Sequence, residues 1–158
     1  MSETRVAVVT GAARGIGRAT AVAFAEAGYR VAGADIAAVA SAAMDYEPAT
    51  AEDLAETGRR VERAGGEWLP VVFDQRDRAA VRDGFAQIVQ RFGGIDVVFA
   101  NAGVQGFASL LEMSDELWDD QIAINLTGTA NVLRTAAPLL VERGGGRIVV
   151  TSSTQGQH

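Results

Sequence analysis

A glycine-rich turn near the N-terminus carries the clearest chemical signal in the sequence. Residues 10–17 read TGAARGIG and follow the apolar run 6–9, which predicts a buried strand. Apolar residues then recur at helical spacing over 16–27. Glycines let backbone N–H groups approach a ligand closely, and the positive end of a helix dipole attracts negative charge. The turn is therefore predicted to bind a pyrophosphate at the start of the helix, and its candidate cofactor-binding residues are Gly11, Arg14, Gly15, Ile16 and Gly17.

An acidic residue at the end of the next predicted strand supports a nucleotide site. Asp35 ends the run 29–35 and stands about 20 residues after Gly15, the spacing at which a carboxylate binds ribose hydroxyls in dinucleotide-binding units. Its charge would repel a 2′-phosphate, and Ile36 after it adds no positive charge. NAD is therefore favoured over NADP, with a solvated loop acid as the plainer interpretation of Asp35.

The composition narrows the classes of function. The chain has 158 residues, a net charge of -6, no cysteine and a single histidine, His158. An acidic chain without a basic block is a poor partner for nucleic acid or an anionic membrane. The lack of cysteine excludes thiolate chemistry, and one histidine leaves little for a metal site. With no membrane-length apolar run and no signal-like N-terminus, we expect a cytoplasmic protein.

Strand-like and helix-like segments alternate along the chain, which predicts an α/β fold. This alternation is typical of a Rossmann-type doubly wound parallel sheet in a three-layer α/β/α arrangement, here one domain over residues 1–158. Strands are expected at 6–9, 29–35, 68–73, 95–100 and 147–151, and helices at about 16–27, 50–64, 81–92 and 114–142. Pro138 predicts a kink near Arg134 in the last helix, because its ring would meet that carbonyl.

Polar and small residues follow the later strands at their carboxyl ends, where open parallel sheets bind ligands. They are Asp74 and Gln75 after the third strand, Asn101, Ala102 and Gly103 after the fourth, and Ser152 and Ser153 after the fifth. Asp74 could instead cap the following helix, and Asn101 could serve only to brace the central strands.

Together these motifs resemble the short-chain dehydrogenase/reductase family, in its compact single-domain branch, over essentially the whole chain. The matching features are TGxxxGxG at 10–17, Asp35, Asp74, the NAG segment at 101–103, Asn125, and Ser152, Ser153 and Gly156. The resemblance implies an NAD(P)-dependent oxidoreductase that interconverts an alcohol and a ketone or aldehyde by hydride transfer. It also implies a parent protein that is a homo-oligomer, a tetramer or a dimer.

The resemblance assigns roles around the reacting atoms. Ser153 matches the catalytic serine that stabilises charge on the substrate oxygen, with Ser152 as the competing assignment. Asn125 matches a residue that holds a water linking the catalytic lysine to solvent, and we expect it on the inner face of its helix with Ile122, Leu126 and Thr129. A satisfied core asparagine is the alternative for Asn125.

The resemblance also assigns roles around the nucleotide. Asp74 matches the position that binds the adenine amino group, and Gln75 would add backbone contacts. The small residues of segment 101–103 let the backbone pass close to the nicotinamide-side ribose. Arg14 opposes the preference for NAD, because a basic residue before Gly15 helps bind the 2′-phosphate in some relatives.

Two departures from the family pattern matter. The family's catalytic tyrosine, about 13 residues after the serine, and its lysine would fall beyond His158. We therefore expect an N-terminal fragment of a longer enzyme, inactive alone, with an incomplete sheet and an unprotected fifth strand. The connection after Asp35 is also long, and its YEPAT run at 46–50 is similar to an actinobacterial subgroup related to carveol dehydrogenases. In that subgroup NAD is held tightly and reoxidised through the redox peptide mycofactocin.

Two other functions stay open on the sequence. A complete dinucleotide-binding half without the proton-transfer pair also fits a non-catalytic nucleotide-binding sensor or interaction module. A remnant that does not fold is the third hypothesis.

Overall fold

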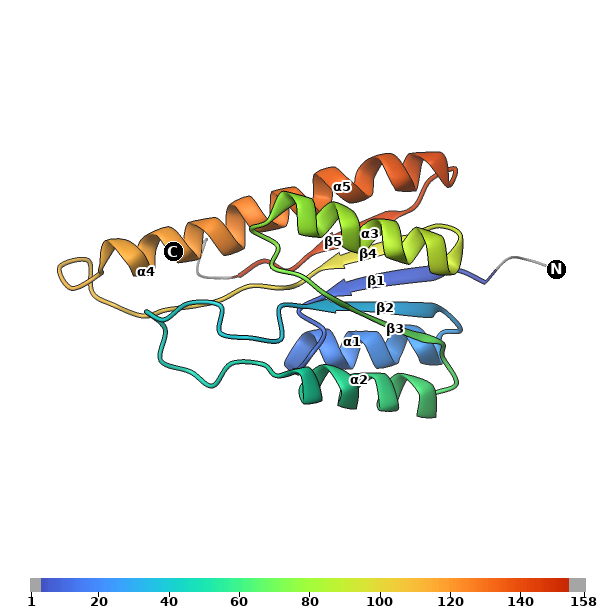
Figure 1. The fold of residues 1–158 in the computed structure, drawn as a ribbon, viewed down its shortest axis with the longest axis horizontal. Coiled ribbons are helices and arrows are strands. Elements are labelled where there is room, and N and C mark those ends of the chain that lie inside the picture. The colour runs from blue at the N-terminus through green and yellow to red at the C-terminus, as the bar shows by residue number, and fades with distance from the viewer. Residues whose placement is uncertain (1–3, 154–158) are drawn as a thin grey trace.

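The computed structural model describes residues 4–153 and shows a sheet with helices on both faces (Figure 1). The sheet has five strands in the order β3-β2-β1-β4-β5, and every neighbouring pair is parallel. The strands are β1 (Val6–Thr10), β2 (Arg30–Asp35), β3 (Trp68–Val72), β4 (Val97–Ala100) and β5 (Arg147–Val150). The predicted Rossmann-type α/β fold is confirmed.

Helices form the two outer layers. They are α1 (Gly15–Glu26), α2 (Ala51–Arg63), α3 (Arg78–Phe92), α4 (Asp115–Gln121) and α5 (Thr129–Glu142), with a π-helical segment, η1 (Ile122–Gly128), between α4 and α5. Figure 1 shows α1 and α2 on one face of the sheet and α3 and α5 on the other. No helix in residues 4–153 is long and apolar enough to cross a membrane.

The central strand β1 explains why the sheet needs both layers. Its five residues are all buried. Val6 and Val8 belong to the core shared with α3 and α5, while Val9 packs in the core beside α1 and α2. A strand apolar on both faces is stable only between two helical layers.

Local signals fix the helix boundaries. Thr50 caps α2 in a reciprocal capping box with Asp53, as the acidic first turn of that segment suggests. Asp77 caps α3, and Gly93 ends it with φ 85° in the left-handed region.

The last helix differs from the prediction. The helix α5 is continuous through Arg134 and Pro138, and the kink expected near Arg134 stays a prediction. The irregular turns lie earlier, in η1, where the backbone has the wider π-helical spacing.

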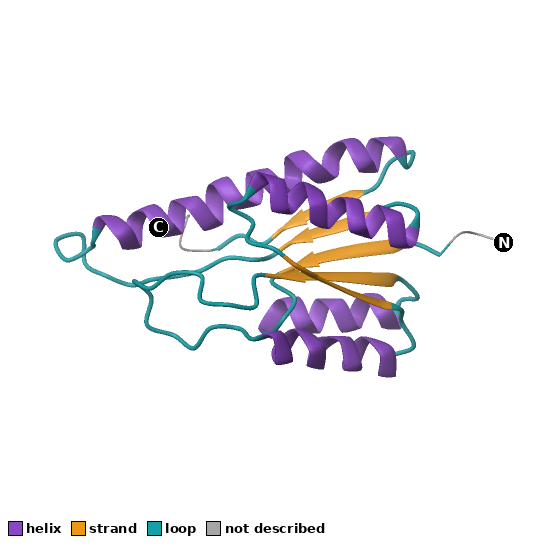
Figure 2. Cartoon of the chain, in the orientation of Figure 1, coloured by secondary structure: helices purple, strands orange, loops and turns teal. Residues whose placement is uncertain are grey.

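The strand β5 lies at the edge of the sheet and pairs with β4. All four of its residues are exposed, among them Ile148, Val149 and Val150. The predicted unprotected strand is confirmed. The long loops gather at the opposite side from the N-terminus, around the carboxyl ends of the strands (Figure 2).

Candidate functional site

A cleft of about 670 Å³ opens at the carboxyl ends of the strands. Its walls come from the glycine-rich turn, the loop between β2 and α2, the ends of β3 and β4, η1 and the segment after β5. The predicted site residues that line it are Gly11, Arg14, Ile16, Asp35, Ile36, Asp74, Gln75, Asn101, Ala102, Gly103, Asn125, Ser152 and Ser153. Gly15 and Gly17 belong to the same turn without lining the cleft.

The glycine-rich turn is too tight for other residues. Gly11 has φ 67°, and a Cβ there would lie 2.9 Å from Ala102 Cα. A Cβ on Gly17 would lie 1.9 Å from the Gly11 carbonyl oxygen. Gly15 has φ 55°, with open space where a Cβ would be. The N-cap of α1 is Arg14, which makes no side-chain cap, so the first N–H groups of the helix are left for a ligand.

The carboxylate of Asp35 is held in place at the end of β2. The side chain is 9% exposed. The N–H of Ala13 donates to Oδ2 and that of Ala37 to Oδ1, both at 2.9 Å. Ala37 takes a left-handed φ of 50° to do so. Each oxygen keeps further acceptor capacity for a ligand hydroxyl. A buried carboxylate that accepts two backbone hydrogen bonds does not fit the alternative of a solvated loop acid.

Asp74 is paired with Arg76 on the cleft wall. Arg76 Nη2 donates to Oδ2 at 2.6 Å, and the Arg76 N–H donates to Oδ1 at 2.9 Å. Burial works to raise the pKa of Asp74, but hydrogen bonds from Arg76 outweigh it and leave the pKa below its ordinary value. The helix-cap alternative does not hold, since Asp77 is the residue that caps α3.

Gln75 contributes its side chain to the protein interior. It is buried, and its Nε2 donates to the carbonyl oxygens of Ile124 at 2.8 Å and Ala102 at 3.2 Å. The backbone carbonyl of Gln75 accepts a hydrogen bond from Asn131 Nδ2 at 2.9 Å. Gln75 therefore braces η1 and the segment after β4.

Asn101 ties three strand ends together. Its Nδ2 donates to the Thr10 carbonyl at 3.2 Å, and its Oδ1 accepts from Thr151 Oγ1 at 3.0 Å. Thr10 Oγ1 accepts the N–H groups of Asn101 and Ala102, each at 3.0 Å. The bracing interpretation of Asn101 is therefore the one these contacts support. Thr10, the first residue of the TGxxxGxG motif, thus has a bracing role that the motif alone does not reveal.

Asn125 lies in η1 and bonds to one residue of the opposite loop. Its Oδ1 accepts the N–H of Val104 and its Nδ2 donates to the Val104 carbonyl, both at 2.8 Å. The expected inner face is wrong, because Ile122 is 39% exposed, Leu126 is 64% exposed and Asn125 is exposed as well. No other part of residues 4–153 covers this side of η1, and the apolar pattern alone could not show that.

Ser152 and Ser153 both line the cleft and are exposed, so position alone does not decide between them. Gly156 of the family motif and His158 lie outside the described residues. Within residues 4–153, no group of three His, Cys, Asp or Glu side chains could hold a metal ion.

The loop between β2 and α2 closes over the turn through Arg14. Arg14 Nη1 donates to the Glu47 carbonyl at 2.6 Å, and its guanidinium carbon lies 5.6 Å from the Tyr46 ring centre. Burial raises the pKa of Tyr46, against the opposing effect of the Arg14 charge.

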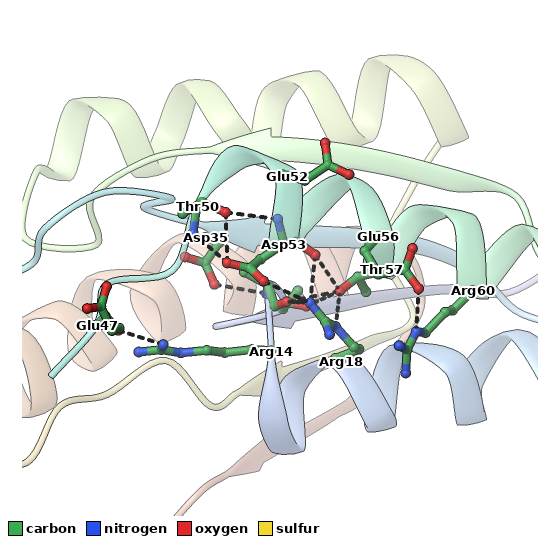
Figure 3. A network of polar contacts seen from close by, with 12 residues as sticks. Arg14, Arg18, Asp35, Glu47, Thr50, Glu52, Asp53, Glu56, Thr57 and Arg60 are labelled. Carbon is green, nitrogen blue, oxygen red and sulfur yellow. Dashed lines mark hydrogen bonds and ion pairs between the residues drawn. The ribbon is translucent and has the colours of Figure 1, made fainter.

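A second arginine, which sequence reasoning missed, fastens the turn to α2 (Figure 3). Arg18 Nε donates to Thr57 Oγ1 at 2.9 Å, and Arg18 Nη2 donates to the carbonyls of Asp53 (2.9 Å) and Ala13. Thr57 Oγ1 in turn donates to Ala12 O at 2.9 Å. The partners are 39 positions apart, so no local pattern could reveal them.

Comparison with known proteins identifies the class that this fold and cleft define. The family described as "short chain dehydrogenase" matches the sequence over residues 5–158. The chain belongs to the short-chain dehydrogenase/reductase family.

Several of the similar proteins come from mycobacteria. An "uncharacterized NAD-dependent oxidoreductase" of Mycobacterium tuberculosis is 48% identical over 153 residues, which are 96% of this chain and 56% of that protein. A short chain dehydrogenase from Mycobacterium paratuberculosis, solved bound to NAD, has a TM-score of 0.94 at 40% identity and covers 98% of this chain and 57% of its own. Carveol dehydrogenase from Mycobacterium avium in complex with NAD has a TM-score of 0.93 at 35% identity, covering 99% and 57%. This chain thus spans about half the length of these relatives.

Proposed function

We propose that residues 1–158 form one NAD(P)-binding domain that takes NAD in preference to NADP. The observation that carries this proposal is the Asp35 carboxylate, buried at the cleft wall and fixed by the N–H groups of Ala13 and Ala37. A fixed carboxylate accepts ribose hydroxyls without reorganising and repels a 2′-phosphate. NAD in the M. paratuberculosis and M. avium neighbours supports the same choice.

The residues present suit a dinucleotide. Gly11 and Gly17 allow the turn to close on itself, and α1 offers N–H groups that no side chain caps. Such a turn binds a pyrophosphate. Asp74 and Gln75 stand at the end of β3, on the wall proposed to face the adenine, and segment 101–103 lines the part proposed for the nicotinamide-side ribose.

The proposed reaction interconverts an alcohol and a ketone or aldehyde, for which NAD, when bound, supplies the hydride acceptor or donor. The Ser153 hydroxyl would donate a hydrogen bond to the substrate oxygen and stabilise its developing charge, with Ser152 as the alternative. Asn125 has both polar groups on Val104, yet it keeps one N–H and one lone pair for the proposed water.

The tyrosine–lysine pair that would move the proton is not among these 158 residues at the expected offset. The 158 residues alone are therefore expected not to turn over substrate. A non-catalytic dinucleotide-binding sensor remains the second candidate, because the contacts proposed for NAD do not need that pair.

Calorimetry and turnover together test the proposal in the natural protein that carries this sequence. NAD binding with nicotinamide reduction by a panel of secondary alcohols is the expected result. Binding without any turnover supports the sensor, and an absence of binding contradicts both.

We further propose that the protein belongs to the carveol-dehydrogenase-like subgroup, in which NAD stays bound and is reoxidised through mycofactocin. Its similarity to the M. avium carveol dehydrogenase and the loop that reaches Arg14 support this. The natural protein would be a cytoplasmic homo-oligomer. Purified protein should retain NAD through gel filtration, and NAD lost on a desalting column would contradict tight retention.

A further inference from the structure

Two arginines line the cleft, and their surroundings differ. Arg76 is engaged by carboxylates, with Nη2 2.6 Å from Asp74 Oδ2 and Nη1 3.3 Å from Asp120 Oδ1. Arg14 contacts only neutral groups among residues 4–153, namely the Glu47 backbone carbonyl and the Tyr46 ring. The charge of Arg14 is therefore not neutralised, and Arg14 is the cleft cation best able to attract an added phosphate.

Arg14 is also close in the chain to the ribose-binding position. It follows Ala13, whose N–H is bonded to Asp35 Oδ2. A phosphate on the ribose held by Asp35 would sit beside this stretch of the turn, where a guanidinium is its natural partner. In Figure 3, however, the Arg14 side chain extends to Glu47.

The loop that holds Arg14 is itself anchored. Met44 and Ser41 are buried within it. At its end, Thr50 and Asp53 form the capping box of α2, and Arg18 binds Asp53. Because both the buried middle and the end of the loop are fixed, Tyr46 and Glu47 cannot simply follow Arg14 toward a new ligand.

We propose that the Tyr46–Glu47 segment selects against NADP by holding Arg14 away from the position of a 2′-phosphate. This inference rests on the proposed dinucleotide site. It makes selectivity a product of two parts: the Asp35 carboxylate repels the phosphate, and the loop withholds the cation that would otherwise compensate. Removing Asp35 alone would therefore give only part of the switch to NADP.

The test measures NADP and NAD affinity by calorimetry in the natural full-length protein, at one fixed salt concentration, in an Asp35→Ser background. Adding Tyr46→Ala removes the ring and should raise the ratio of NADP to NAD affinity about fivefold, the scale of an exposed cation–π contact. Adding Tyr46→Phe keeps an aromatic face and should leave the ratio of the Asp35→Ser protein. Adding Arg14→Gln to Asp35→Ser/Tyr46→Ala should abolish the gain.

Two results would overturn the inference. One is an unchanged ratio in Asp35→Ser/Tyr46→Ala, and the other is a gain that persists with Arg14→Gln, which would mean that the loop excludes the phosphate by its bulk. If the alanine variant does not fold, Tyr46→Leu keeps a large apolar side chain without an aromatic face and carries the same expectations. Unmodified protein that binds no NAD would instead end the proposed function, a separate and distinguishable failure.

Discussion

The two halves of the cleft differ in how firmly they are built. On the side of β2, the polar groups are buried or bonded to the backbone: Asp35 has two N–H donors, and Arg18 fastens the turn to α2. On the side of β5, both serines are exposed, Asn125 is exposed although it is bonded to the Val104 backbone, and apolar side chains of η1 and β5 are open to solvent.

The comparison shows that, in the half proposed for the nucleotide, the polar groups are held by contacts within the protein. Its groups are oriented before a ligand arrives, so little ordering cost remains to be met on binding. In the half proposed for the reacting groups, the candidate side chains are exposed. Substitutions on the two sides should therefore have separable effects, on dinucleotide affinity on one side and on local stability on the other.

The largest expected effect comes from Gly17→Ala. Its Cβ would overlap the backbone oxygen of Gly11 at 1.9 Å, so the turn must shift. We expect NAD affinity to fall by about a hundredfold or more and the free energy of unfolding to drop by about 3 kcal/mol. Calorimetry and urea denaturation measure the two.

The matched control for that change is Gly28→Ala, which lies just beyond the C-terminal end of α1 and does not line the cleft. A Cβ at Gly28 would meet no atom within 4 Å, so the substitution costs only the strain of a φ of 81°, about 1–2 kcal/mol. Equal losses in the two variants would show that the tight turn is not what binds the ligand.

Asp35→Ala should come next in size. Loss of the carboxylate is expected to weaken NAD binding about tenfold, and to narrow the gap to NADP, because ribose hydroxyls lose an ionised acceptor. Asp45→Ala removes the same charge from an exposed position of the neighbouring loop and serves as the control. If titration gives the same NAD and NADP constants for both variants, Asp35 does not grip the ribose.

The fold was largely predictable because its signals are local. In the apolar stripe expected on α3, Val81, Phe85, Ile88 and Phe92 are buried, as their spacing indicates, and Val89 is half-buried. Alternating apolar runs and glycine stops likewise placed each strand to within about two residues of its observed limits.

The features that the sequence did not predict depend on contacts between distant residues. The π-helical turns of η1 have no composition of their own, and the Arg18–Thr57 bond joins separate helices. The inner face assigned to Asn125 was wrong because an apolar stripe states only that a helix face can be buried, not that another segment lies on it. Neither the position of Arg14 nor its contact with Glu47 could be read from the turn motif.

A smaller effect is expected from Asn125→Ala, on the open side of the cleft. It removes two exposed bonds to Val104 and should lower the free energy of unfolding by about 1 kcal/mol or less. NAD affinity should stay within about twofold, if the two halves are independent. Asn131→Ala, a buried amide bonded to Gln75, is the contrast and should cost about 2 kcal/mol. A tenfold loss of NAD affinity in Asn125→Ala would show that the two halves of the cleft are energetically coupled.

The smallest effect concerns acid stability at the Asp74–Arg76 pair, which belongs to the firmly built wall. In the folded protein the pKa of Asp74 lies below its ordinary value of 3.8, so the carboxylate binds a proton more tightly in the unfolded chain than in the folded one. Its stabilising contribution is thus complete above about pH 4 and disappears as the pH falls through the lowered folded pKa.

A double-mutant cycle of Asp74→Asn and Arg76→Gln isolates this contribution. Because both side chains are partly exposed, the coupling energy should be about 1 kcal/mol or less at pH 7. It should shrink toward zero in acid, as followed by urea denaturation at several pH values. A coupling that stays constant down to pH 2 would mean that the pair is held by packing, since protonating the carboxylate removes the charge but leaves the shape of the side chain in place.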